Sequence, residues 1–209
     1  MKDFLIWMGR SIFAGILIGI AGWGFLANPV FGMFLFSVGL IGVVKYGAKL
    51  YTGTAGFLTS WRDIPNLLMI LVGNIIGCLI IAVIALYSPL GLATAATGII
   101  TARLGVGWLG CGLLAIGCGI LMSFAVDFAR YAEREVNEHF SNWLPLLFAV
   151  PVFILCGFPH CIADAFYCCV YLLNTPEVAW GSLTAYYGSI VVGNFIGCNV
   201  WKLLGMNKN

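Results

Sequence analysis

The sequence predicts an all-α integral membrane protein whose six transmembrane helices form two inverted three-helix repeats. Composition gives the class, since 62% of the 209 residues are hydrophobic and only 9% are charged. A soluble domain of this size presents much more charge to water, so a soluble globular protein is excluded. A membrane-spanning helix takes about 20 apolar residues, and a chain of this length therefore holds about six spans with short loops. We interpret residues 1–209 as a single transmembrane domain.

Hydropathy divides the chain into six apolar segments, and two of them are longer than one straight span needs. The second segment carries a polar patch at Tyr51-Thr52-Gly53-Thr54, and the fifth is interrupted between Gly157 and Asp164. We expect helices 2 and 5 to be broken at these points, and the first helix to end at Asn28-Pro29. The six segments run over approximately Phe4–Leu26, Val30–Ser60, Pro65–Tyr87, Leu104–Phe128, Trp143–Leu173 and Val178–Leu204.

An internal repeat relates the two halves of the chain. The stretch VGNIIGC at residues 72–78 is echoed by VGNFIGC at residues 192–198. Repeat one covers about residues 1–88 and repeat two about residues 104–205, and an odd number of spans in each inverts the second half. Paired broken helices in such a repeat point to a transport site near the middle of the bilayer. Two roles stay open for Asn74 and Asn194: a hydrogen bond across a helix contact or, for Asn194, a place in the conduit.

Basic residues set the expected orientation in the membrane. With six spans, both termini and the second and fourth loops share one side, which carries seven basic residues against Arg103 alone in the other loops. An excess of Lys and Arg marks the cytoplasmic side, so we expect cytoplasmic termini and a multi-pass protein of the inner (plasma) membrane. The polar stretch 130–142, with His139, is expected to be a solvated connection. The seven basic residues are Lys2, Arg10, Arg62, Arg130, Arg134, Lys202 and Lys208.

Two ionisable residues inside the fifth apolar segment are the first candidates for function. His160 and Asp164 stand in CGFPHCIAD at residues 156–164, where glycine and proline indicate an interrupted helix. A charged side chain at membrane depth costs about 2.5–3.5 kcal/mol on insertion scales, and interrupted helices there are buried in protein or line a cavity. We therefore expect His160 to be a pore or relay residue. The alternative is a structural histidine that bonds a backbone carbonyl at the helix break.

Three blocks of sequence resemble the formate/nitrite transporter family, whose members include hydrosulfide channels. GLI at residues 39–41, followed by YGAKLYTG at 46–53, is similar to the family's second-span pattern. GFPHCIAD at 157–164 is similar to its fifth-span motif GFEHSIAN, and GNFIG at 193–197 to its sixth-span motif GNIIG. The order and spacing of the blocks fit the family over essentially the whole chain.

The resemblance implies an aquaporin-like fold, a homopentamer with a pore in each protomer, and a channel for small monovalent weak-acid anions of the formate, nitrite or hydrosulfide class. It implies that His160 is the central pore histidine, that Thr52 is its hydrogen-bonding partner, and that Asn194 lies near the pore centre. We expect no enzymatic activity, no cofactor and no metal. The expected hydrophobic constrictions are Phe36, Leu40, Leu50 and Phe153.

Four positions depart from the family pattern and change the charges around His160. Pro159 and Lys49 stand where the family has acids, and Asp164 stands where it has asparagine. Arg103 is the best counterpart of the family's lysine ahead of the fourth span. An isolated charge at this depth is heavily penalised, so we expect Lys49 and Asp164 to pair between the two broken helices.

The expected mechanism lowers the cost of moving an anion through dry constrictions. Lys45, Arg103 or the N-termini of the half-helices would attract the anion into a vestibule. His160 would then donate a hydrogen bond or a proton at the centre, so that the solute crosses with little net charge. Burial disfavours the charged form of His160, so we expect a mostly neutral donor.

Two other functions stay open as alternatives. The first is a channel for a small neutral solute, such as water, ammonia or undissociated acid, although the intramembrane Lys45 and Lys49 favour anions. The second is a membrane enzyme or redox carrier, which needs paired histidines or facing acids, whereas the chain has two histidines in all. The eight cysteines lack metal-ligand spacing, and no basic run indicates nucleic acid. The expected partners are the anion, membrane lipid and further copies of the chain.

Overall fold

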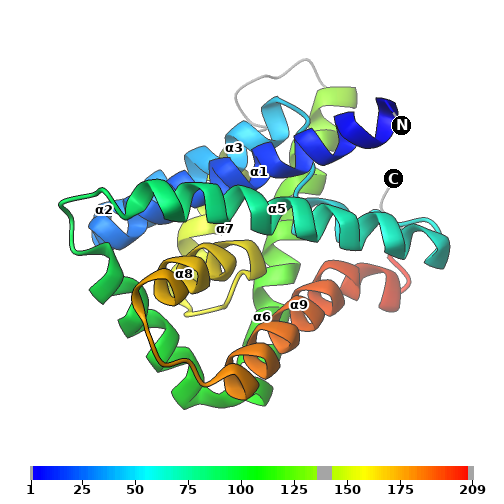
Figure 1. Ribbon diagram of the computed structural model, residues 1–209. Helices are drawn as coiled ribbons and strands as arrows, with labels where there is room; N and C mark the ends of the chain where they lie inside the picture. The colour runs from blue at the N-terminus through cyan, green and yellow to red at the C-terminus, as the bar shows by residue number, and fades with distance from the viewer. Residues whose placement is uncertain (1, 136–142, 207–209) are drawn as a thin grey trace.

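The computed structural model describes residues 2–135 and 143–206, with side chains from Phe4 to Arg130 and from Trp143 to Met206. This part of the chain is helical and contains no β-strand (Figure 1), so the predicted all-α class is confirmed. The helices in chain order are α1 (Lys2–Ala27), α2 (Pro29–Leu35), α3 (Ser37–Lys45), α4 (Thr52–Ala55), the 3-10 helix η1 (Trp61–Asp63), α5 (Ile64–Ala85), α6 (Leu92–Glu135), α7 (Leu144–Leu155), α8 (Cys161–Asn174) and α9 (Trp180–Leu203).

Apolar helices with apolar surfaces make this a multi-pass membrane protein. Within the described ranges, three helices are long and apolar enough to cross a membrane: Phe4–Ala27, Trp61–Ala85 and Leu92–Arg130. Large apolar side chains face outward, and Phe31 and Leu155 are each 69% exposed. Such a surface suits lipid and not water. Shorter apolar helices cover Pro29–Lys45, Leu144–Leu155 and Cys161–Asn174.

The first helix ends where the sequence predicts. α1 ends at Ala27, and Asn28 caps the next helix by accepting a hydrogen bond from the amide of Phe31 at 3.2 Å. Pro29 stands at the first position of α2, where its missing N–H is not needed. The Asn-Pro pair therefore stops one helix and starts another within one residue.

Glycines bring the long helices into close contact in both halves of the chain. α1 lies against α5, and α6 against α9 (Figure 1). A Cβ atom on Gly77 would lie 2.2 Å from the carbonyl oxygen of Ile12, and one on Gly197 would lie 2.1 Å from that of Ile116. Only glycine fits at these positions, because any side chain would separate the two backbones.

The chain leaves α3 and α7 through the same kind of turn. Gly47 (φ +58°) and Gly157 (φ +68°) each adopt the left-handed conformation two residues after the last helical residue. In each turn the amide that follows the glycine donates to the carbonyl five residues earlier, at 2.9 Å. This is the Schellman end of a helix, which satisfies carbonyls that the helix leaves open. Short non-helical stretches then lead to α4 and α8.

Helix α6 is longer than the sequence predicts and changes two expectations. It begins at Leu92, twelve residues before the expected start at Leu104, and it bends at Gly107, whose backbone is not helical (φ +81°, ψ 161°). Arg103 therefore lies in the first part of a helix and not in a loop. The helix also continues to Glu135, so the first residues of the expected polar loop are helical. His139 and the rest of that loop lie outside the described residues.

Candidate functional site

Asn74 holds the stretch between α3 and α4 against α1. Its side-chain oxygen accepts from the amide of Tyr51 at 2.9 Å. Its side-chain nitrogen donates to the carbonyls of Ser11 and Lys49, each at 2.8 Å. Asn74 is fully buried, so one amide side chain uses all three of these hydrogen bonds to join the backbone of this stretch to that of α1.

Asn194 does the same for the stretch between α7 and α8. Its oxygen accepts from the amide of Cys161 at 2.8 Å, and its nitrogen donates to the carbonyls of Ala115 at 2.8 Å and Pro159 at 3.0 Å. Cys161 and Pro159 are the two neighbours of His160. The fully buried Asn194 thus acts as a backbone clamp around His160, and it is not among the described residues that line the cavity beside it.

His160 uses its two ring nitrogens for different contacts. Its Nδ1 accepts from the amide of Ala163 at 3.1 Å and caps the N-terminus of α8. Its Nε2 lies 3.0 Å from Oγ1 of Thr52, the first residue of α4. A neutral imidazole has one donor and one acceptor nitrogen, so Nδ1 as acceptor assigns the proton to Nε2. His160 therefore donates to Thr52, and the hydroxyl proton of Thr52 is left to point elsewhere.

Two phenylalanines extend from the ring of His160. Phe153 stacks on it with ring centroids 5.7 Å apart and planes at 24°. Phe36 contacts Phe153 edge-on, with ring centroids 6.3 Å apart and planes at 84°. Of the expected constriction residues, Phe153 thus contacts His160 and Phe36 contacts Phe153. The other two, Leu40 and Leu50, are each 1% exposed in the hydrophobic core.

A cavity of about 270 Å³ opens beside His160. Arg103 and Asp164 line it, and they are the only ionised side chains among its described lining residues. The remaining lining residues are Phe25, Ile99, Ala102, Val106, Phe153, Ile154, Gly157, Phe158, His160, Ala163 and Tyr167. The site therefore combines an apolar chamber, one neutral histidine and one pair of opposite charges.

The expected pair of Lys49 and Asp164 is wrong. Nε of Arg103 lies 3.5 Å from Oδ1 of Asp164, whereas Nζ of Lys49 lies 4.7 Å from the centre of the Trp7 ring. The backbone explains the difference, because the amide of Lys49 donates to the carbonyl of Arg10 at 3.2 Å and ties this stretch to α1. A cation over a tryptophan face is stabilised without an acid.

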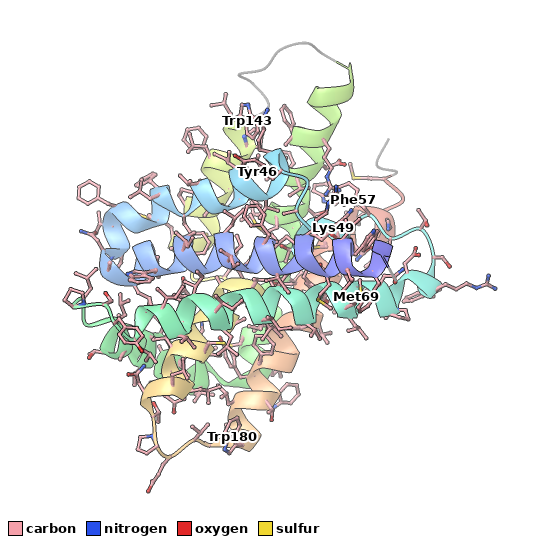
Figure 2. The ribbon with its side chains drawn as sticks, turned by 45° about the horizontal axis from the view of Figure 1, so that its top comes forward. Tyr46, Lys49, Phe57, Met69, Trp143 and Trp180 are labelled. Carbon is pink, nitrogen blue, oxygen red and sulfur yellow. The ribbon has the colours of Figure 1, made fainter. Side chains whose placement is uncertain are left out.

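The lysines lie away from the cavity. Lys45 is the last residue of α3 and is exposed, and Lys49 is half-buried. In Figure 2, Lys49 is labelled well apart from Trp180, which lies at the bottom of the view. Of the four expected charged residues, the structure brings Arg103 and Asp164 to His160 and leaves the two lysines elsewhere.

Sequence reasoning missed Tyr186, which contacts the carboxylate of Asp164. The Tyr186 hydroxyl donates to Oδ1 of Asp164, and Tyr186 is fully buried in α9. The available signal was a hydroxyl inside an apolar helix, eight residues before Asn194 on the same helix. Nothing in that signal named the partner, because α8 and α9 meet only in the folded chain.

These features define a class: a multi-pass helical membrane protein with a buried polar centre between two short helices. The chain belongs to the formate/nitrite transporter family, whose sequence model matches residues 2–205. It is therefore a membrane transport protein.

Two solved structures share the fold. One is a pentameric formate channel with formate bound, at 23% identity and a TM-score of 0.78 over 98% of this chain and 96% of that chain. Another is an FNT family ion channel, at 19% identity and a TM-score of 0.75 over 96% of this chain and 88% of that chain. No match was found among curated protein sequences.

Proposed function

We propose that the protein is a channel for small monovalent weak-acid anions of the formate, nitrite or hydrosulfide class, with His160 at the centre of the conduit. The observation that carries this proposal is the contact between His160 and Thr52, at 3.0 Å. It joins the first residue of α4 to the residue that caps α8. The start of a helix carries partial positive charge, so the start of α8 beside this contact suits a negatively charged solute.

The aromatic residues beside this contact supply the barrier. Phe36 and Phe153 are 2% and 3% exposed, and a dry apolar constriction disfavours an ion. Because the Nε2–H of His160 donates to Thr52, the hydroxyl proton of Thr52 is directed elsewhere, and it is the donor that an anion can use at this point. Arg103, at the cavity on one side, is the cation nearest to it among the lining residues.

We further propose six spans in two inverted repeats, with helices 2 and 5 broken. The matching roles of Asn74 and Asn194 support this arrangement, as do the matching turns at Gly47 and Gly157. The single channel domain would assemble as a homopentamer in the inner membrane, with both termini in the cytoplasm. The fold shared with a pentameric formate channel supports the assembly, and the excess of basic residues on one side supports the orientation.

Uptake into proteoliposomes tests the proposed function. The full-length wild type and His160→Ala are compared for formate, nitrite, hydrosulfide and chloride at two pH values. Uptake of one or more weak-acid anions over chloride, lost in the variant, is the expected result. Absence of anion uptake by a well-folded wild type would contradict the proposal.

A channel for a small neutral solute is the second candidate. The observation in its favour is that the two ionised side chains in the cavity, Arg103 and Asp164, are of opposite sign. In the same vesicles, water or ammonia flux without anion uptake would favour this candidate over the first.

A further inference from the structure

Asp164 is held by three groups from different parts of the chain. Oδ2 accepts from the amide of His160 at 3.0 Å. Oδ1 accepts from the hydroxyl of Tyr186 and lies 3.5 Å from Nε of Arg103. The carboxylate is therefore fixed by α9 and by the turn before α8, and it cannot swing away from the arginine.

Arg103 is also held in place, but not all of its N–H groups have a hydrogen-bond partner. Its Nη1 donates to the carbonyl of Gly157. Its Nε has no hydrogen-bond partner among the described residues. The side chain is 19% exposed and lines the cavity next to His160. An anion in the cavity would thus meet a guanidinium whose charge is already opposed at close range.

We propose that Asp164 is a specificity-determining residue that weakens the hold of Arg103 on an anion in this cavity. The inference rests on the proposed function, since it concerns how strongly the same solute is held. A conducting site must bind well enough to admit the solute and weakly enough to release it. Arg103 is the only cation among the described residues that line the cavity. A fixed carboxylate beside it weakens the binding of the anion and makes its release fast.

Tyr186 is a positioning residue in this arrangement. Its phenol is neutral and holds Oδ1 of Asp164 toward Arg103. Tyr186→Phe removes this bond and leaves both charges in place. The change in anion affinity is therefore expected to be smaller than that caused by removing the charge of Asp164.

Equilibrium binding of ¹³C-labelled formate to the purified full chain in detergent tests the inference. Asp164→Asn keeps the size of the side chain and removes its charge. The dissociation constant should fall about tenfold, which corresponds to 1.4 kcal/mol. Asp127→Asn is the matched control, because it removes one acid from α6 outside the cavity lining, and it should leave the constant unchanged. An unchanged constant in Asp164→Asn would overturn the inference.

Transport by the same variant separates the inference from the proposed function. In proteoliposomes, Asp164→Asn should lower both the half-saturation concentration and the maximal rate, since a tighter site releases more slowly. A wild type that transports formate, with both values unchanged in the variant, refutes the role of Asp164 alone. A wild type that transports no anion refutes the proposed function.

A double variant covers the case in which Asp164→Asn does not fold. Arg103→Gln with Asp164→Asn removes both ionised groups of the described cavity lining together, so neither charge is left without the other. The inference predicts formate binding close to that of the wild type, because the two charges already oppose each other there. A large loss of binding in the double variant would contradict it, since Arg103 would then hold the anion in spite of Asp164.

Discussion

At the scale of single residues, the two ring nitrogens of His160 make two different contacts. Nδ1 completes the N-terminus of α8, and Nε2 faces Thr52. A proton on Nδ1 would break the cap and place a positive charge at the start of a helix, where the dipole opposes it. The geometry thus favours a hydrogen-bond donor at Nε2 over a histidine that carries protons through both nitrogens.

Thr52 offers a test of the donor arrangement. Thr52→Val keeps the shape of the side chain and removes the acceptor of the His160 proton, and a buried donor without a partner costs about 1–3 kcal/mol. Solute flux in proteoliposomes should fall by about tenfold, the change that 1.4 kcal/mol produces. Thr52→Ser keeps the hydroxyl and should retain most of the flux. Equal flux in the Val and Ser variants would argue against a role for the hydroxyl.

The two clamping asparagines should matter for stability. Asn194→Ala removes three hydrogen bonds to backbone groups, as does Asn74→Ala. The two groups of each set that lie outside a helix interior lose their partner, at about 1–3 kcal/mol each. Both variants should lower the midpoint of thermal unfolding in detergent. Asn174→Ala is the control, because it loses one bond, to Val170 on the same helix. A midpoint like that of the control in either variant would mean that the clamp is dispensable.

The residue types in the sequence predicted part of the candidate site, but not all of it. His160 and Asp164 stood out because ionisable groups are rare in apolar segments. Their partners did not, since a carboxylate at this depth takes whichever cation the fold brings near. Lys49 stands in the same sequence motif as Thr52, but the backbone at Lys49 is bonded to α1. The cation that reaches Asp164 is Arg103, which lies on helix α6.

At the scale of elements, local signals mark where helices stop. Asn28-Pro29 ends α1 at Ala27, and left-handed glycines end α3 and α7. Each signal acts within a few residues, so it is readable in the sequence. The bend at Gly107 was not readable, because its glycine is one of 27 in the chain. Its distinguishing feature is a backbone conformation, which only the folded helix α6 reveals.

Close helix contact makes a prediction about Gly197. In Gly197→Ala the new methyl would meet the carbonyl of Ile116 at 2.1 Å, so α6 and α9 must separate. Such overpacking costs about 1–3 kcal/mol, and the unfolding midpoint should fall. Gly9→Ala is the control, since nothing lies within 4 Å of its new methyl group. Similar midpoints for the two variants would show that the contact is less tight than described.

At the scale of the whole molecule, the two halves of the chain repeat one design. Each half has an asparagine clamp, a left-handed glycine turn and a short helix, and the two short helices meet at Thr52 and His160. The sequence repeat drew attention to Asn74 and Asn194 and was consistent with hydrogen bonds across helix contacts. It did not identify the groups to which the two side chains bond. Those targets are backbone groups, and a sequence does not say which backbone groups a fold leaves unpaired.

The central claim is that Nδ1 of His160 caps α8, whereas Nε2–H orients the hydroxyl of Thr52 toward the solute. Uptake of formate and the unfolding midpoint should be measured together for His160→Asn and His160→Gln. Asparagine is a strong N-cap and replaces Nδ1, whereas the longer glutamine places its amide nitrogen near the position of Nε2. The account predicts a stable Asn variant with little flux and a less stable Gln variant that keeps part of it. Wild-type flux in His160→Asn would contradict the account, because the cap alone would then suffice.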